Sequence, residues 1–182
     1  TEVRKQIALR NEEYFSHMLD VYGDHAICMV AKLNFPKQIS SLEKEIAEMT
    51  EEMNSESLSR KRAKAIAEKL PEKQKELNQL KEEYGREGKD EVITSGCLAV
   101  YNDSLMELFY TGNNPDYMRT FSSYYLWSKY LDRCITLGIP SVSFGGIEGT
   151  LDDGLTQFKS NWIMNVEEYI GEFNIILDPL MY

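Results

Sequence analysis

Two rows of apolar residues with heptad spacing, separated by a short polar stretch, constrain the fold of this chain more than any other feature. Both lie between Lys37 and Glu87, in a stretch dense in Glu, Lys, Ala and Leu, the composition of a long helix. Apolar residues alternately three and four positions apart form a stripe along a helix, and this stripe needs a partner helix. The first row is Ile39, Leu42, Ile46, Met49 and Met53, and the second is Ala63, Ile66, Leu70, Lys73, Leu77, Leu80 and Tyr84.

The polar residues between the rows, Asn54 to Ser57, suit a turn and the start of a helix. Two rows of similar length joined by such a turn pack most simply against each other. We therefore predict an antiparallel coiled-coil hairpin, or arm, over residues 37–89. Pro71 should kink the second helix or restart it, and Gly85 and Gly88 should end it.

Strand and helix patterns flank the arm on both sides, so we interpret it as an insertion in a sheet domain. Before it, Asn11–Tyr22 has a helical pattern and Ala26–Phe35 is typical of a buried strand. After it come two extended runs, Val92–Tyr101 and Leu105–Tyr110. The turn residues Asn102–Ser104 separate these runs and predict a β-hairpin.

The last third of the chain continues the alternation of helices and strands. We predict an amphipathic helix over Met118–Leu137 that ends at Gly138. Its apolar side would consist of Phe121, Tyr124, Tyr125, Leu131 and Ile135. A short strand over Ser141–Phe144, a helix over residues 153–159 and a strand over residues 166–176 should follow. The predicted fold class is α/β (α+β), with a sheet domain made of residues 1–36 and 90–182 and the inserted arm over residues 37–89.

Charge is distributed unevenly between the arm and the rest of the chain. Residues 37–89 carry twelve Lys and Arg and twelve Asp and Glu, so the net charge of −10 comes from the sheet domain. An acidic body repels nucleic acid, so we expect no DNA partner and, at most, a local contact with RNA. The arm holds a dense basic cluster, which either contacts phosphates or forms a solvated helix face. The cluster is Arg60, Lys61, Arg62 and Lys64.

Metal and membrane signals are absent from the sequence pattern. His17 and His25 lack the partners of a zinc site, and we predict neither a metal nor a cofactor. The three cysteines make no CxxC and lie among apolar neighbours, which predicts buried, reduced thiols and fits a reducing cytoplasm. We find no apolar run long enough to span a membrane and no secretory signal in the N-terminal residues.

Four local patterns after the arm resemble, in their order, the C-terminal domain of the Fem family, which includes FemA, FemX and MurM. They are Phe109–Asn113 (FYTGN), Arg119–Phe121 (RTF) followed by Tyr124, Val142–Ile147 (VSFGGI), and Gln157–Lys159 (QFK) followed by Glu168–Gly171 (EYIG). A strand that ends Asn34-Phe35 and continues into a helical arm resembles the FemA-like branch of the family. The resemblance covers nearly the whole chain.

The resemblance implies a fold and a reaction. The fold would be one half of a tandem acyltransferase (GNAT-like) fold. Family members transfer an amino acid from aminoacyl-tRNA, their co-substrate, to a side-chain amine in the stem peptide of a lipid-linked or UDP-linked peptidoglycan precursor. Such a reaction implies that the protein is located in the cytoplasm. It is also compatible with a transient association with the inner membrane surface. The family's precursor cleft lies largely in its other half, so we expect this chain to be inactive alone.

The resemblance also assigns roles to particular residues. Its Phe-Lys pair maps onto Phe158 and Lys159, where an ammonium would stabilise charge on the reacting carbonyl oxygen and the ring would exclude water. A surface lysine beside a core phenylalanine is the alternative. The candidates for a cleft around the tRNA acceptor end are Tyr110, Asn113, Arg119 and Tyr124, although packing is the alternative for the tyrosines. The arm resembles the tRNA-binding arm of seryl-tRNA synthetase, which makes the basic cluster a candidate tRNA contact.

Two other functions remain open on the sequence. A CoA-dependent N-acyltransferase would need a glycine-rich pyrophosphate loop before the long helix, whereas residues 113–119 contain no glycine and carry Asp116. A coiled-coil interaction or dimerisation module would pair the row from Ala63 to Tyr84 between chains. A CoA titration tests the first, and sedimentation at several concentrations tests the second.

Overall fold

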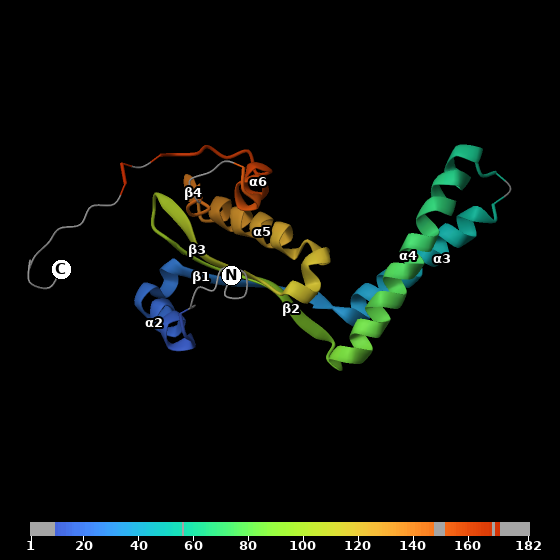
Figure 1. Ribbon diagram of the computed structural model, residues 1–182, viewed down its shortest axis with the longest axis horizontal. Helices are drawn as coiled ribbons and strands as arrows, with labels where there is room; N and C mark the ends of the chain where they lie inside the picture. Colours follow the sequence, from blue (N-terminus) through green and yellow to red (C-terminus); the bar gives the residue numbers. More distant parts are fainter. Residues whose placement is uncertain (1–9, 56, 148–151, 169, 172–182) are drawn as a thin grey trace, which may run out of the picture. The chain divides into compact units, whose positions relative to one another are not determined.

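The computed structural model describes residues 10–55, 57–147, 152–168 and 170–171 of the chain. The chain divides into two compact units, Thr1–Ser143 and Phe144–Tyr182, and each is described by itself. The first unit contains the sheet and the helical arm, and the second contains a short helix (Figure 1).

The first unit is built on a four-stranded mixed sheet with the strand order β1-β2-β3-β4. The strands β1 (Ala26–Asn34), β2 (Glu91–Tyr101) and β3 (Leu105–Asn113) are antiparallel neighbours, and the short β4 (Ser141–Ser143) runs parallel to β3. The predicted β-hairpin is confirmed. Asn102 closes its turn, because its Oδ1 accepts hydrogen bonds from the backbone N–H of Ser104 and Leu105 at 2.8 and 2.9 Å.

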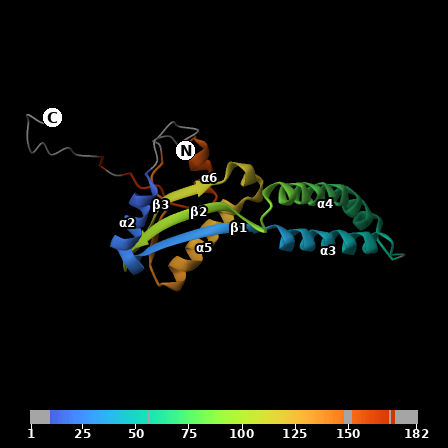
Figure 2. The same cartoon turned by 90° about the horizontal axis from the view of Figure 1, so that it is seen from below.

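The helices α2 (Glu12–Tyr22) and α5 (Ser122–Thr136) cover opposite faces of the sheet (Figures 1 and 2). Side chains alternate between the two faces along a strand. Leu98 and Val100 of β2 accordingly pack with Met18 of α2. The predicted helix before β1 is confirmed, and Asn11 caps it by accepting a hydrogen bond from the Tyr14 N–H at 3.0 Å.

The apolar side that we predicted for α5 is wrong. The helix starts later than expected, after a 3-10 helix η2 (Pro115–Thr120), and it buries Leu126, Trp127, Tyr130 and Cys134. Three of the five side chains expected to be buried are exposed: Phe121 (68%), Tyr125 (61%) and Ile135 (75%).

Apolar and aromatic residues lie all around α5, so periodicity alone does not select the buried face. Burying Tyr130 requires a partner for its hydroxyl group. The sheet provides one, because the Tyr130 hydroxyl lies 3.0 Å from the Met106 carbonyl oxygen and 3.2 Å from that of Ser143.

The helices α3 (Phe35–Met53) and α4 (Arg60–Glu87) form a hairpin, which we call the arm, between β1 and β2. As predicted, the two apolar rows face each other, and Leu42, Ile66, Leu77 and Leu80 are buried. Ion pairs also join the helices. They are Arg62–Glu52 at 2.6 Å, Lys73–Glu45 at 3.1 Å and Lys81–Glu43 at 2.6 Å.

The ends of the arm helices differ in detail from the prediction. Asn34 caps α3 by accepting from the Lys37 N–H at 2.9 Å, so this helix begins at Phe35, before the predicted boundary. Gly88, with a left-handed φ of 62°, ends α4 as expected, whereas Gly85 lies inside the helix. Because α4 runs through Pro71 as one helix, a restart at Pro71 is wrong. The domain boundaries at residues 36–37 and 89–90 stay a prediction.

The second unit contains α6 (Gly154–Ser160), which confirms the helix predicted there. Asp153 caps it, and its Oδ1 accepts from the backbone N–H of Leu155 at 2.7 Å and of Thr156 at 2.9 Å. We predicted a strand over residues 166–176. Its described residues, 166–168 and 170–171, do not form a strand. The other residues of that prediction lie outside the described part of the chain.

Two further expectations concern cysteines and membrane spans. Cys97 and Cys134 are buried as expected, whereas Cys28 is exposed, so the expectation of a buried thiol there is wrong. None of the helices in the described ranges is long and apolar enough to cross a membrane.

Candidate functional site

Lys159 is a buried lysine whose ammonium contacts two successive backbone carbonyls. It lies in the last turn of α6 and is 6% exposed. Its Nζ donates hydrogen bonds to the carbonyl oxygens of Gly145 at 3.0 Å and Gly146 at 2.7 Å. Gly145 has a φ of 70°, a left-handed conformation that favours glycine, at the turn where both carbonyls meet the ammonium.

The electrostatics of this site follow from its burial. Loss of hydration lowers the pKa of Lys159, and the carboxylate of Asp153 partly opposes this shift. An ammonium has three N–H groups, and the two carbonyls use two of them. Chemically, an ammonium is a group that can stabilise negative charge, most strongly where water is excluded.

Aromatic rings lie close to Lys159 in the sequence of the second unit. Phe158 precedes it and is half-buried. Phe144 and Trp162 stack on each other, with ring centroids 6.3 Å apart and planes inclined by 24°. The sequence analysis identified Phe158 and Lys159 but missed Asp153 and the two carbonyls, although the Gly145-Gly146 pair indicated an unusual backbone.

Two predicted cleft residues lie where β3 ends and α5 begins. Asn113 is the last residue of β3, and its Oδ1 accepts a hydrogen bond from the Ser123 hydroxyl at 2.6 Å. Tyr124 is half-buried on the first turn of α5, with its ring centroid 6.3 Å from that of Phe121. The structure therefore brings these two parts of the chain together.

Tyr110 lies on the other face of the sheet, with α2. Its hydroxyl donates to the Tyr14 hydroxyl at 3.3 Å, and its ring meets that of Phe15 edge to face at 5.0 Å. The hydrogen bond with Tyr14, together with burial, raises the pKa of Tyr110. These contacts are those of a packing residue, which was the alternative for this tyrosine.

Arg119, the fourth predicted cleft residue, forms an ion pair with Glu83 of α4. The Glu83 side chain is 9% exposed, and its other carboxylate oxygen accepts from the Gln79 amide at 3.0 Å. Nearby, the Tyr117 hydroxyl donates to Glu87 at 2.9 Å. The segment η2, which carries Arg119 and Tyr117, thus contacts α4. Sequence reasoning missed Glu83 because its heptad position does not distinguish it from a solvated glutamate.

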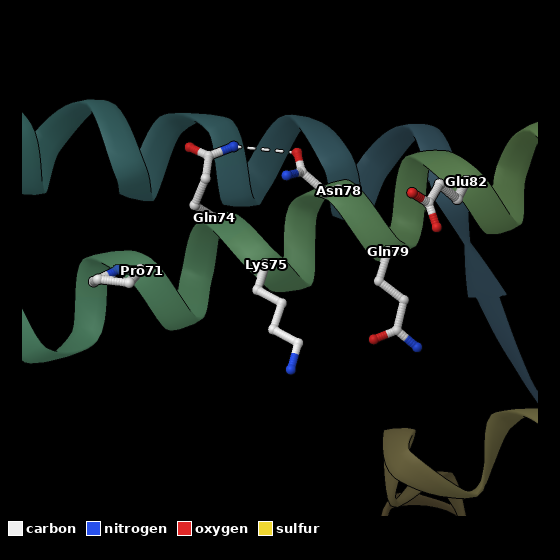
Figure 3. A pocket seen from close by; sticks show the side chains of 6 residues that line it. All are labelled: Pro71, Gln74, Lys75, Asn78, Gln79 and Glu82. Carbon is white, nitrogen blue, oxygen red and sulfur yellow. Dashed lines mark hydrogen bonds between the residues drawn. The ribbon is translucent and has the colours of Figure 1, made fainter.

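Arg119 also lines a groove of about 310 Å³ at the base of the arm. The other walls of the groove come from β1, α4 and the start of α5, including Lys32, Glu76 and Tyr125. A second hollow, of about 570 Å³, runs along one side of α4 (Figure 3). Its lining residues all belong to this one helix, and none is a predicted site residue.

The basic cluster lies at the start of α4, beside the loop that joins the arm helices. Arg62 makes two hydrogen bonds to the Glu52 carboxylate, at 2.6 and 2.7 Å, which lowers the pKa of Glu52. Lys64 lies 3.9 Å from Glu68. Arg60 and Lys61 are exposed in the first turn of α4. Because cations in the first turn oppose the helix dipole, local helix stability does not explain these two residues.

Within the first unit, Asn113 and Tyr124 lie where β3 ends and α5 begins, whereas the basic cluster lies at the far end of the arm. Lys159 belongs to the second unit. Among the residues that the structure describes, no group of three or more His, Cys, Asp and Glu side chains is placed to hold a metal ion.

Comparison with known proteins defines the class to which this chain belongs. The FemAB family matches residues 1–182, so the chain is a member of the FemAB family, as the sequence resemblance indicated. The chain is 23% identical over 198 residues to "Aminoacyltransferase FemA" of Staphylococcus epidermidis, with 100% of this chain and 47% of that relative covered. It is 24% identical over 196 residues to "Aminoacyltransferase FemA" of Staphylococcus aureus, with 95% of this chain and 44% of that relative covered.

A solved structure shares the fold. The crystal structure of FemX superposes with a TM-score of 0.64 at 19% sequence identity, over 88% of this chain and 44% of that one. The chain therefore spans about half the length of the relatives that it matches.

Proposed function

We propose that this chain forms the C-terminal half of a Fem-type aminoacyltransferase. The reaction would move an amino acid from aminoacyl-tRNA to a side-chain amine in the stem peptide of a lipid-linked or UDP-linked peptidoglycan precursor. The observation that carries this proposal is the buried ammonium of Lys159, which donates to the Gly145 and Gly146 carbonyls. Membership of the FemAB family supports it.

The chemistry of the transfer explains the need for such a group. The acceptor amine attacks the ester carbonyl carbon, a C–N bond forms, and negative charge develops on the carbonyl oxygen. The C–O bond to the terminal ribose of the tRNA then breaks, and the amine proton passes to the departing hydroxyl oxygen. Lys159 would stabilise the intermediate charge, an effect that is stronger where water is excluded. Phe158 would contribute to that exclusion of water.

The remaining candidate residues would hold the tRNA. Asn113 and Tyr124 would line part of the cleft for the acceptor end. On the arm, Arg60, Lys61 and Lys64 would contact backbone phosphates, whereas Arg62 is already paired with Glu52. The other half of the enzyme would hold the precursor, so we expect this chain to be inactive alone. Aminoacyl-tRNA as co-substrate would place the reaction in the cytoplasm.

The test replaces Lys159 by Met and measures transfer from aminoacyl-tRNA to a muropeptide precursor, with an N-terminal half supplied as in the relatives. We expect kcat to fall by about 10² to 10³, which is the usual effect of losing one oxyanion donor. Lys75→Met, which removes an exposed lysine of α4, is the matched control and should leave kcat unchanged. A Lys159→Met protein that keeps its melting temperature and its full turnover would reject the role of Lys159.

The two other functions have direct tests. A dimerisation module would pair the apolar rows between chains, but here they pack against each other within one chain. We therefore expect sedimentation to show no concentration-dependent association through the arm. A CoA titration should show no binding, because the segment before α5 carries Asp116 and lacks the glycines that admit a pyrophosphate.

A further inference from the structure

The arm joins the sheet at two adjacent chain connections, which together form a neck. The strand β1 ends at Asn34 and α3 begins at the next residue, while three residues separate the end of α4 at Glu87 from the start of β2 at Glu91. The two connections touch, because the Phe35 N–H donates to the Asp90 carbonyl oxygen at 2.8 Å. Two adjacent attachments define an axis, and rotation of the arm about that axis is fixed only by a third attachment.

The segment η2 contacts the arm outside these two connections. Arg119 pairs with Glu83, and the Tyr117 hydroxyl donates to Glu87 at 2.9 Å. Glu83 and Glu87 lie one turn apart and therefore on the same side of α4. The Tyr117 ring is 2% exposed and packs in an apolar cluster with Phe35 and residues of both arm helices. Two residues of η2, two positions apart, thus contribute to one contact with α4 (Figure 1, yellow segment before α5).

Two features show that this contact is specific. The Arg119–Glu83 ion pair is partly buried. Such a pair contributes little net stability, but its geometry is demanding, so it specifies an arrangement more than it strengthens the fold. In addition, Phe121, which follows η2, has a left-handed φ of 51° and is 68% exposed. A strained non-glycine residue persists where its surroundings fix the backbone on both sides. Here the backbone is fixed by η2 against α4 on one side and by α5 against the sheet on the other.

We infer that η2 is a strut that sets the angle between the arm and the sheet, and that Arg119 and Tyr117 are positioning residues that act through Glu83 and Glu87. The consequence for tRNA rests on the function proposed above. Glu83 lies about 35 Å along α4 from Arg60, at about 1.5 Å per residue, so a rotation of about 10° displaces Arg60 by about 6 Å. A displacement of this size breaks a hydrogen bond to a phosphate.

The test measures the direction of the arm in the 182-residue chain, without any substrate. Nitroxide labels at Glu51→Cys, near the end of α3, and Arg133→Cys, on α5, report the distance between the arm and the body. Cys28→Ser removes the exposed native thiol. We expect one narrow distance distribution in this background. Arg119→Met and Tyr117→Phe should each broaden it or move its centre by several ångströms, up to about 6 Å.

Matched controls separate the strut from general loosening of the arm. Lys81→Met breaks the Lys81–Glu43 ion pair within the arm and leaves η2 untouched, so it should keep the narrow distribution. The charge swap Arg119→Glu with Glu83→Arg should restore the narrow distribution that Arg119→Met disturbs. Unchanged distances in folded Arg119→Met would overturn the inference. If that variant does not fold, unchanged distances in both Tyr117→Phe and Glu83→Gln overturn it equally.

A second readout connects the strut to catalysis. In the transfer assay, Arg119→Met should raise KM for aminoacyl-tRNA about tenfold and leave KM for the precursor unchanged. Lys159→Met, by contrast, acts on kcat. An arm that moves while KM for tRNA stays constant would count against the proposed tRNA contact, whereas an arm that stays in place would count against the strut.

Discussion

At the scale of single residues, Lys159 is held where an ammonium is poorly hydrated. Its two carbonyl partners carry partial charges, and Asp153 is the acidic group that favours its charged form. Because Asp153 also caps α6, its position is fixed by the two backbone N–H groups that it accepts from. The helix that carries Lys159 therefore also fixes the carboxylate that partly opposes the lowering of its pKa.

The lowered pKa of Lys159 predicts how stability depends on pH. The unfolded lysine keeps its proton up to its ordinary pKa of 10.5, whereas the folded one releases it at a lower pH. Between these values the unfolded state binds more protons, so the free energy of unfolding should rise with pH. Below the folded pKa both states are protonated and the burial cost is constant. Lys159→Met should abolish the rise.

Urea unfolding measures this effect when it is followed by the fluorescence of Trp162, which lies in the same unit, in a Trp127→Phe background that removes the other tryptophan. The difference between the native chain and Lys159→Met isolates one residue, because the tyrosines and cysteines that also titrate in alkali are common to both proteins. Parallel pH profiles of the two proteins would show that the burial of Lys159 has no effect on its ionisation.

At the scale of elements, Pro71 is the clearest conflict between local preference and observed structure. It lies inside α4 and is exposed. A proline in the interior of a helix removes one backbone hydrogen bond, and its ring conflicts with the carbonyl four residues before it. The helix persists because the apolar row on its other side is buried against α3.

Replacing Pro71 by Ala should therefore raise the free energy of unfolding by about 1 to 3 kcal/mol. Chemical denaturation followed by circular dichroism measures the change. Glu72→Ala, at the next exposed position of α4, is the control and should change stability by less than about 0.5 kcal/mol. No gain from Pro71→Ala would mean that Pro71 does not destabilise α4 in the folded arm.

The helices and strands differ in how well they could be predicted from the sequence alone. The arm, the β-hairpin and the helix before β1 could be predicted because each depends on a local pattern: a heptad row, turn residues or helical periodicity. The buried face of α5 could not, because aromatic residues surround that helix and the choice depends on a carbonyl of β3 that accepts from Tyr130.

The candidate site residues also differ in how well they could be predicted from the sequence. Phe158 and Lys159 came from resemblance to a family, and the burial of Lys159 agrees with the proposed role. The partners of Tyr110 and Arg119 could not be predicted, because their contacts with Tyr14 and Glu83 join residues 96 and 36 positions apart. Such contacts depend on the sheet and the arm having formed.

At the scale of the whole molecule, charge separates the arm from the body. The arm is neutral while the remainder of the chain carries the net charge of −10. A polyanion is therefore repelled by the net charge of the remainder, whereas the exposed cations Arg60 and Lys61 of α4 offer a local favourable contact.

The double variant Arg60→Glu with Lys61→Glu should weaken tRNA binding and make it less sensitive to salt. The slope of log K against log salt should become shallower by roughly 0.7 to 0.9 for each phosphate that the variant no longer neutralises. Filter binding at several salt concentrations measures this slope. Lys69→Glu with Lys75→Glu makes the same change in charge further along α4 and should have a smaller effect. Equal effects of the two pairs would indicate a response to total charge and would exclude a local contact.

The neck has a consequence for how such arms can vary in length. Asn34 both completes β1 and caps α3, so one extra residue there would turn α3 about its own axis by about 100° and carry its apolar row away from α4. The loop at the opposite end of the arm does not fix the rotation of either helix about its own axis. Inserting seven residues into each helix beside that loop would lengthen the arm by about 10 Å and preserve every contact below it. Natural variation in arm length should therefore accumulate at the tip in whole heptads, while the junction with the sheet keeps a constant number of residues.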